Sequence, residues 1–105
     1  MSRPSDSLLV KLTNVVSKAK LFSSNFANVD FRIYQDEVKK ELFFIEVSKG
    51  RCSRRVLVDG RTAENVKKGN TDIILLREIR GALQFVANQA RELEAKAARI
   101  AERRR

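Results

Sequence analysis

The stretch from Asp30 to Asp59 reads DFRIYQDEVKKELFFIEVSKGRCSRRVLVD. Apolar and polar residues alternate along it with a period of two, and β-branched and aromatic residues fill the segments between turn formers. Such a pattern is typical of consecutive antiparallel strands. It predicts strands over 30–35, 41–48 and 53–59, with connections at 36–40 and 49–52.

The residues that follow this stretch offer a further turn. Asp59-Gly60 is a two-residue turn signal, because both residue types tolerate a positive φ angle. We therefore expect Arg61 to Val66 to return as a short fourth strand. A polar linker over 67–70 then leads to Thr71 or Asp72, either of which is a suitable N-cap for a helix.

The first twenty residues predict a short helix. Ser5, Asp6 or Ser7 is expected to cap it, and apolar residues then follow at helical spacing. A strand that enters the sheet is the competing interpretation, because paired valines and the run Lys20-Leu21-Phe22 also suit a strand. In the segment after it, Phe22 and Phe26 are expected to anchor a loop to the core. The apolar positions of the helix are Leu8, Leu12, Val15, Val16 and Ala19.

The last third of the chain carries a heptad pattern, with apolar residues spaced alternately three and four apart. Its first half is widened by Ile73, Leu75, Ala82 and Phe85 into a face suited to packing on a sheet. We expect the helix to cover its own sheet to about Asn88 and then to protrude into a contact with another subunit, or else to end as a solvated helix. The seam consists of Leu76, Ile79, Leu83, Val86, Ala90, Leu93, Ala97 and Ile100.

These elements predict an α+β fold: an antiparallel meander of three to four strands packed on a long C-terminal helix, with a short N-terminal helix. The expected organisation has three parts. Residues 1–27 form the N-terminal helix and connector, residues 28–88 the sheet-plus-helix domain, and residues 89–105 a protruding basic, coiled-coil-like helix.

Alternation along the predicted strands separates two faces. One face is apolar and is expected to seat the long helix; it holds Phe31, Ile33, Phe43, Ile45, Val47, Val56 and Val58. The other face mixes cations with flat rings; it holds Arg32, Tyr34, Leu42, Phe44, Glu46, Arg55 and Leu57. This second face is either a stacking platform for bases or a second buried layer, covered by the first helix or a partner subunit. A register slip of one residue would exchange the two faces.

Composition removes most enzyme classes. The 105 residues include no histidine and a single cysteine, Cys52, so His/Cys metal sites, Ser–His or Cys–His nucleophile pairs and an internal disulfide are excluded. We expect no catalytic residues, no metal and no cofactor. An enzyme that acts through Asp36, Glu37 and Glu41 is disfavoured, because these carboxylates have no evident cleft.

The net charge of +9 favours a polyanionic partner. Four cations without an acid, at Lys49, Arg51, Arg54 and Arg55, form either a solvated loop or a phosphate clamp at the end of the sheet. Lys39 and Lys40 are expected to approach them if the intervening segments pair. The run 103–105 is a smaller basic group with the same two interpretations, phosphate contact or a solvated end.

The order of strands and helix resembles the single-stranded nucleic-acid binders that include the Whirly and PUR-alpha proteins. The rhythm of LFFIEV at 42–47, SRRVLV at 53–58 and LREI at 76–79 is similar to that of a PUR repeat, and the resemblance covers about residues 30–88. It implies strands that bind single-stranded DNA or RNA and helices that assemble the sheets into dimers or larger units. It would place Arg32, Tyr34, Phe44 and Arg55 near nucleic acid.

The sequence therefore predicts a non-enzymatic protein that binds nucleic acid, preferably single-stranded, and forms homo-oligomers through its C-terminal helix. The alternative is a protein-interaction module whose heptad helix is the functional surface. No apolar stretch suits a signal peptide or membrane span, so we expect an intracellular protein, in cytoplasm or nucleus, and a Ser-rich organelle presequence stays open. The expected nucleic-acid contacts are Arg32, Tyr34, Lys39, Lys40, Phe44, Lys49, Arg51, Arg54, Arg55 and Arg61.

Overall fold

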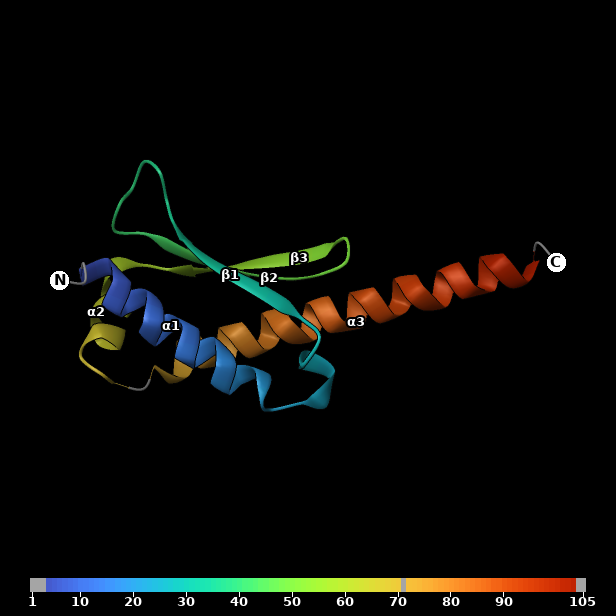
Figure 1. Ribbon diagram of the computed structural model, residues 1–105, viewed down its shortest axis with the longest axis horizontal. Helices are drawn as coiled ribbons and strands as arrows, with labels where there is room; N and C mark the ends of the chain where they lie inside the picture. The colour runs from blue at the N-terminus through green and yellow to red at the C-terminus, as the bar shows by residue number, and fades with distance from the viewer. Residues whose placement is uncertain (1–3, 71, 104–105) are drawn as a thin grey trace.

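The computed structural model describes residues 4–70 and 72–103, with side chains from Ser7 onward (Figure 1). It has the predicted α+β fold. The elements are α1 (Pro4–Lys20), the single 3-10 turn η1 (Ser24–Phe26), β1 (Asp30–Gln35), β2 (Phe43–Lys49), β3 (Cys52–Val58), α2 (Gly60–Lys67) and α3 (Ile73–Arg103).

The sheet has three antiparallel strands in the order β1-β2-β3. Its register places Ile33 opposite Ile45, and Ile45 opposite Val56, which keeps the alternating apolar residues on one face. The predicted strands are confirmed to within two residues at each end. The β2–β3 connection turns at Gly50, whose φ of +61° is a conformation that side chains rarely adopt.

The helices cover the apolar face of this sheet, as predicted. In Figure 1 α1 and α3 lie together below the strands, and Val47 and Val58 of the sheet are fully buried in the same core as Leu12 of α1 and Leu83 of α3. Phe31 and Ile33 of β1 are half-buried at the border of this core. Burial of apolar surface stabilises a fold by about 25 cal/mol per Å². This shared core is therefore the main source of the stability of the fold.

The predicted fourth strand is wrong, because residues 60–67 form α2. Asp59 does not start a hairpin turn; its Oδ1 accepts a hydrogen bond from the Thr62 backbone N–H at 2.8 Å and caps the helix. Ala63 and Val66, three residues apart, then fall on one helical face and are buried. An Asp-Gly pair can cap a helix as well as form a hairpin turn. Here the helix is favoured, because it buries Ala63 and Val66 in the core.

The first segment is a helix and not a strand, so the competing interpretation is wrong. Helix α1 begins at Pro4, before the residues expected to cap it, and proline is favoured in a first helical turn. Its predicted apolar positions are buried except for Val15, which is half-buried. After the helix, Phe26 anchors the loop in the core as expected, whereas Phe22 is exposed, with the Arg80 guanidinium 3.9 Å from its ring centroid.

Helix α3 is capped by Asp72, whose Oδ1 accepts a hydrogen bond from the Leu75 N–H at 2.8 Å, while Thr71 lies outside the described residues. The buried side chains of the helix extend as far as Ala90, and Leu93 and Ala97 still lie beside the β2–β3 turn. The last turns of the helix extend beyond the sheet, which stretches the molecule to 60 Å along its longest axis (Figure 1). Two residues expected to widen its apolar face do not do so: Ile73 is exposed, and Phe85 is 41% exposed at the edge of the sheet.

Candidate nucleic-acid interface

The sheet face turned away from α1 and α3 is the strongest candidate site, and we call it the open face. It holds two rows of side chains that run across the strands. In one row Tyr34 pairs with Phe44 and Phe44 with Leu57; in the other Arg32 pairs with Glu46 and Glu46 with Arg55. The open face consists of Arg32, Tyr34, Phe44, Glu46, Arg55 and Leu57.

Aromatic rings and guanidinium groups on the open face touch one another. The ring centroids of Tyr34 and Phe44 lie 5.5 Å apart, with their planes tilted by 31°. The Arg32 guanidinium lies 4.8 Å from the Tyr34 centroid, and that of Arg55 lies 5.1 Å from the Phe44 centroid. Each ring thus has a cation beside it, an arrangement that suits both base stacking and phosphate attraction.

The Glu46 carboxylate, which lies between the two arginines, is paired with one of them. Glu46 Oε1 accepts a hydrogen bond from Arg32 Nε at 2.8 Å. Arg55 is exposed and has no such ion pair among the described residues. Because a guanidinium is charged at any physiological pH, Arg55 is the cation of the open face that no carboxylate pairs.

No described helix covers the open face. Both α1 and α3 pack on the opposite side of the sheet, so the interpretation in which the first helix buries this face is wrong. Leu57 is 50% exposed, and Tyr34 and Phe44 are half-buried only through their neighbours in the sheet. Apolar rings that stay accessible to solvent on one face indicate a contact surface.

The four basic residues around the β2–β3 turn do not form one cluster. Alternation places Arg55 on the open face and Arg54 on the helix side of β3, where its guanidinium lies 4.4 Å from the Phe85 ring centroid. Lys49 lies on the helix side as well and is half-buried, and Arg51 is exposed in the turn. A single phosphate clamp made of all four residues is therefore wrong.

The remaining predicted contacts lie at the far end of the sheet. Lys39 and Lys40 are exposed in the β1–β2 connection, opposite the β2–β3 turn, so the expectation that they approach the basic residues of that turn is wrong. Arg61 is exposed in the first turn of α2, which starts where β3 ends. These three cations share one end of the sheet and form a group separate from the open face.

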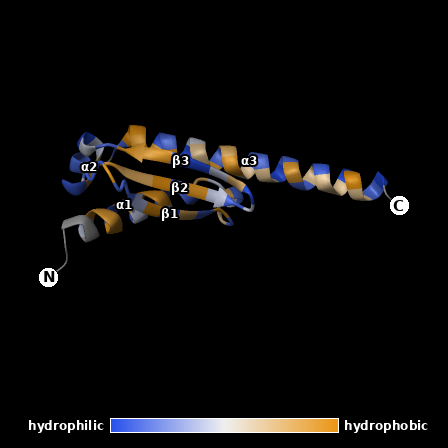
Figure 2. Cartoon of the chain, turned by 90° about the horizontal axis from the view of Figure 1, so that it is seen from above, coloured by the Kyte–Doolittle hydropathy of each residue, from blue (hydrophilic) through white to orange (hydrophobic). Residues whose placement is uncertain are grey.

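Only the distal part of the heptad seam is accessible. Ile79, Leu83, Val86 and Ala90 are buried in the core of the chain itself, and Leu76 is half-buried against it. Leu93 and Ile100 are 48% and 46% exposed, and Ala97 is exposed between them. In Figure 2 hydrophobic and hydrophilic residues alternate along this end of α3.

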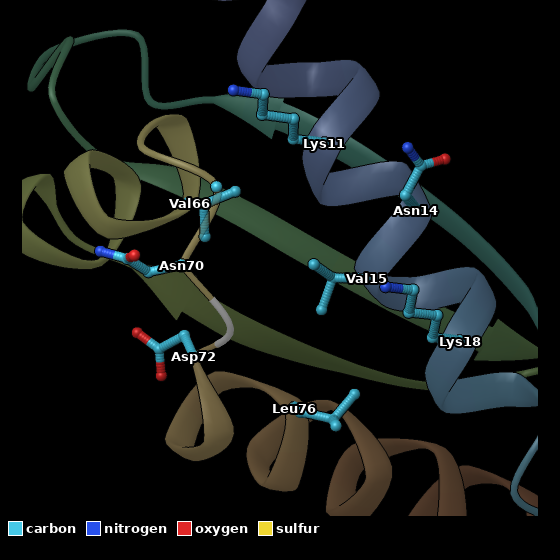
Figure 3. Close-up of a pocket in the computed structure, with 9 residues that line it drawn as sticks. Lys11, Asn14, Val15, Lys18, Val66, Asn70, Asp72 and Leu76 are labelled. Carbon is cyan, nitrogen blue, oxygen red and sulfur yellow. The ribbon is translucent and has the colours of Figure 1, made fainter.

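A cavity of about 210 Å³ lies between α1, the end of α2 and the start of α3 (Figure 3). Val15 and Leu76 line it from two helices, together with Lys11. Two of its polar groups are used inside the protein, because Lys11 Nζ donates to the Lys67 carbonyl and Asp72 caps α3. None of the lining residues belongs to the open face, and we assign this cavity to the helix junction.

Sequence reasoning missed one contact, because it assigned Phe85 to the core. Phe85 sits three residues after the buried Ala82, at the border of the apolar face, and the heptad pattern does not separate such a border position from the interior. Its partner Arg54 was noted only for its charge. The alternation of β3 is the signal that would have separated Arg54 from Arg55.

Comparison of the chain with protein-family models, with curated proteins and with solved structures finds no match in any of the three. None of the helices among residues 4–70 and 72–103 has the length and apolar character needed to cross a membrane. Within the same ranges, no three His, Cys, Asp or Glu side chains group closely enough to hold a metal ion.

Proposed function

We propose that this chain is a non-enzymatic protein that binds single-stranded nucleic acid on the open face of its sheet. The observation that carries the proposal is the alternation of Arg32, Tyr34, Phe44 and Arg55 in mutual contact on a face that no described helix covers. Stacking on such rings contributes about 1–3 kcal/mol per base and tolerates any sequence, because every base has a π face.

One feature favours a single strand over a duplex. Rings on the face of a sheet can stack on bases only when those bases are free of the duplex stack, as they can be in single strands. The net charge of +9 supplies a sequence-independent attraction to phosphates of either form, with the exposed Arg55 on the open face itself. The exposed cations at 39, 40 and 61 extend this attraction to one end of the sheet.

The experiment is a fluorescence-anisotropy titration of labelled single-stranded and duplex oligonucleotides at two salt concentrations. The proposal predicts tighter binding of the single strand, and affinity that falls as salt rises, because phosphate contacts release counterions. An affinity that does not change with salt concentration, or no binding by the folded protein at low salt, would contradict the proposal.

A second candidate function rests on the distal end of α3. Leu93, Ala97 and Ile100 form an exposed apolar stripe at heptad spacing on α3, and Leu93 and Ala97 also line a groove against the β2–β3 turn. This stripe suits assembly with a second copy of the chain, either in support of nucleic-acid binding or as an interaction module in its own right. Light scattering on the purified protein tests it, and a monomer at all concentrations would rule it out.

A further inference from the structure

A groove of about 530 Å³ runs between β3 and α3, on the edge of the sheet. Since the strand order is β1-β2-β3, this edge of β3 has no neighbouring strand. Glu78, Gly81, Ala82 and Phe85 line the groove from α3, and their spacing puts them on one face of that helix. The volume lies within the range of small-ligand pockets.

The groove adjoins the open face. Arg55 lines it and also covers Phe44, while its neighbour Arg54 lines it and covers Phe85. A nucleic-acid strand that lies on the open face therefore needs to pass only over β3 to bring its next base into this groove. There the Arg54 guanidinium, which lies over the Phe85 ring, offers a further flat surface on which a base can stack.

Gly81 keeps the groove open. A Cβ atom at this position would meet nothing within 4 Å, so no neighbouring group requires the absence of a side chain. Glycine in the middle of a helix is unfavourable relative to alanine, and the chain nevertheless has it where α3 faces the groove. A long side chain here would occupy the space that a planar ligand needs.

The carboxylate of Glu78 gives the groove its chemical preference. It is exposed, and the described residues offer it no ion pair. A carboxylate accepts hydrogen bonds and repels phosphate and carbonyl oxygens, so it selects a base edge that presents adjacent donors. Guanine presents N1–H and N2–H side by side, whereas the N3–H of thymine and uracil lies between two carbonyl oxygens.

We propose that this groove holds a guanine base of the bound single strand, stacked on the Arg54 guanidinium that covers the Phe85 ring, with its donor edge on Glu78. The inference rests on the proposed function and deepens it, since it turns a sequence-tolerant surface into one with a preferred base. Bidentate base contacts of this kind discriminate by at least about fivefold in affinity.

The test compares a labelled strand of about 12 thymidines with the same strand carrying one central guanine, by anisotropy titration. For the unaltered protein we expect the guanine strand to bind at least about fivefold more tightly. In Gly81→Gln, which fills the groove, and in Glu78→Gln, which removes the charged acceptor, the two strands should bind alike. Gly81→Ala is the matched control: it changes the same position, leaves most of the groove open and should keep the guanine preference.

The outcomes separate the two proposals. If the unaltered protein does not bind the thymidine strand at low salt, the proposed function fails and the guanine inference falls with it. If it binds both strands equally, or if Gly81→Gln keeps the full guanine preference, the groove inference is overturned while the proposed function stands. Circular dichroism of each variant confirms folding, which neither glycine replacement should impair.

Discussion

Arg54 and Arg55 are adjacent in sequence and cover aromatic rings on opposite faces of the sheet. The Arg55 guanidinium lies 5.1 Å from the Phe44 centroid on the open face, and that of Arg54 lies 4.4 Å from the Phe85 centroid of α3. Strand β3 thus supplies the cation to two cation–π contacts, one on each side of the sheet. This arrangement joins the open face to the groove beside it, and it makes the two arginines separable by substitution.

Removing the Tyr34 ring should weaken binding of single strands without unfolding the protein. Tyr34 is half-buried at a sheet face that no described helix covers, so Tyr34→Ala leaves the core intact. Loss of one stacking ring costs about 1–3 kcal/mol of binding free energy. Anisotropy titration measures the loss, and Tyr34→Phe, which keeps the ring, should bind almost as tightly as the original. Equal affinity for all three proteins would show that bases do not stack at this position.

Replacing Arg55 should change the salt dependence of binding. Arg55→Gln removes the cation of the open face that no carboxylate pairs, and we expect the slope of log affinity against log salt to become shallower by about one. The matched control is Arg77→Gln, which removes one exposed arginine of α3 that lies on neither the open face nor the groove. If both variants change the slope equally, the attraction comes from overall charge and not from the open face.

Acidic substitutions in α3 should separate assembly from folding. Leu93→Asp and Ile100→Asp act on half-exposed side chains of the distal helix, so we expect a smaller mass by light scattering and an unchanged melting curve. Leu83→Asp puts an unpaired charge at a fully buried position and should destabilise the fold by about 4 kcal/mol or more. An oligomer that persists in both distal variants would move the assembly surface away from this stripe.

The cap of α2 should make stability depend on pH in the acidic range. The pKa of the Asp59 carboxyl is lowered, chiefly because the Thr62 backbone N–H donates to it. A group whose pKa is lower in the folded state stabilises the protein above its unfolded-state pKa, and this contribution disappears as pH falls through the folded-state pKa.

Asp59→Asn provides the reference for this effect, because asparagine caps a helix without titrating. Urea unfolding across the acidic range should therefore show the original protein losing stability relative to Asp59→Asn as pH falls. A difference that stays constant with pH would mean that the Thr62 hydrogen bond does not favour the charged carboxylate.

Local sequence patterns were sufficient to predict most of the secondary structure and the α+β fold. The alternation around Ile45 buries one face of the sheet, and the heptad from Ile79 to Ala90 buries one face of the helix, and this burial stabilises both elements. The prediction of a strand after Asp59-Gly60 was wrong, because the same two residues can also cap a helix. The packing of Val66 on the core decides between strand and helix, and such a contact cannot be inferred from a few neighbouring residues.

Strand alternation also predicted part of the candidate site. Strand alternation places Tyr34 and Phe44 on one face, and the structure brings their rings to 5.5 Å. The pairing of Arg54 with Phe85 joins residues 31 positions apart, on different elements, and depends on where α3 crosses the sheet. Charge density alone grouped Arg54 with its neighbours, because composition carries no information on which face a side chain occupies.

Tyr34 itself reports on the central claim, since it is the only tyrosine of the chain and there is no tryptophan. The measurement is its fluorescence during titration with an unlabelled single strand, corrected for absorption by a parallel titration of free tyrosine amide. The account predicts quenching that saturates at the midpoint seen by anisotropy, because a base stacked on the ring changes its environment. Saturable binding by anisotropy with unchanged Tyr34 emission would contradict it and place the nucleic acid on another surface.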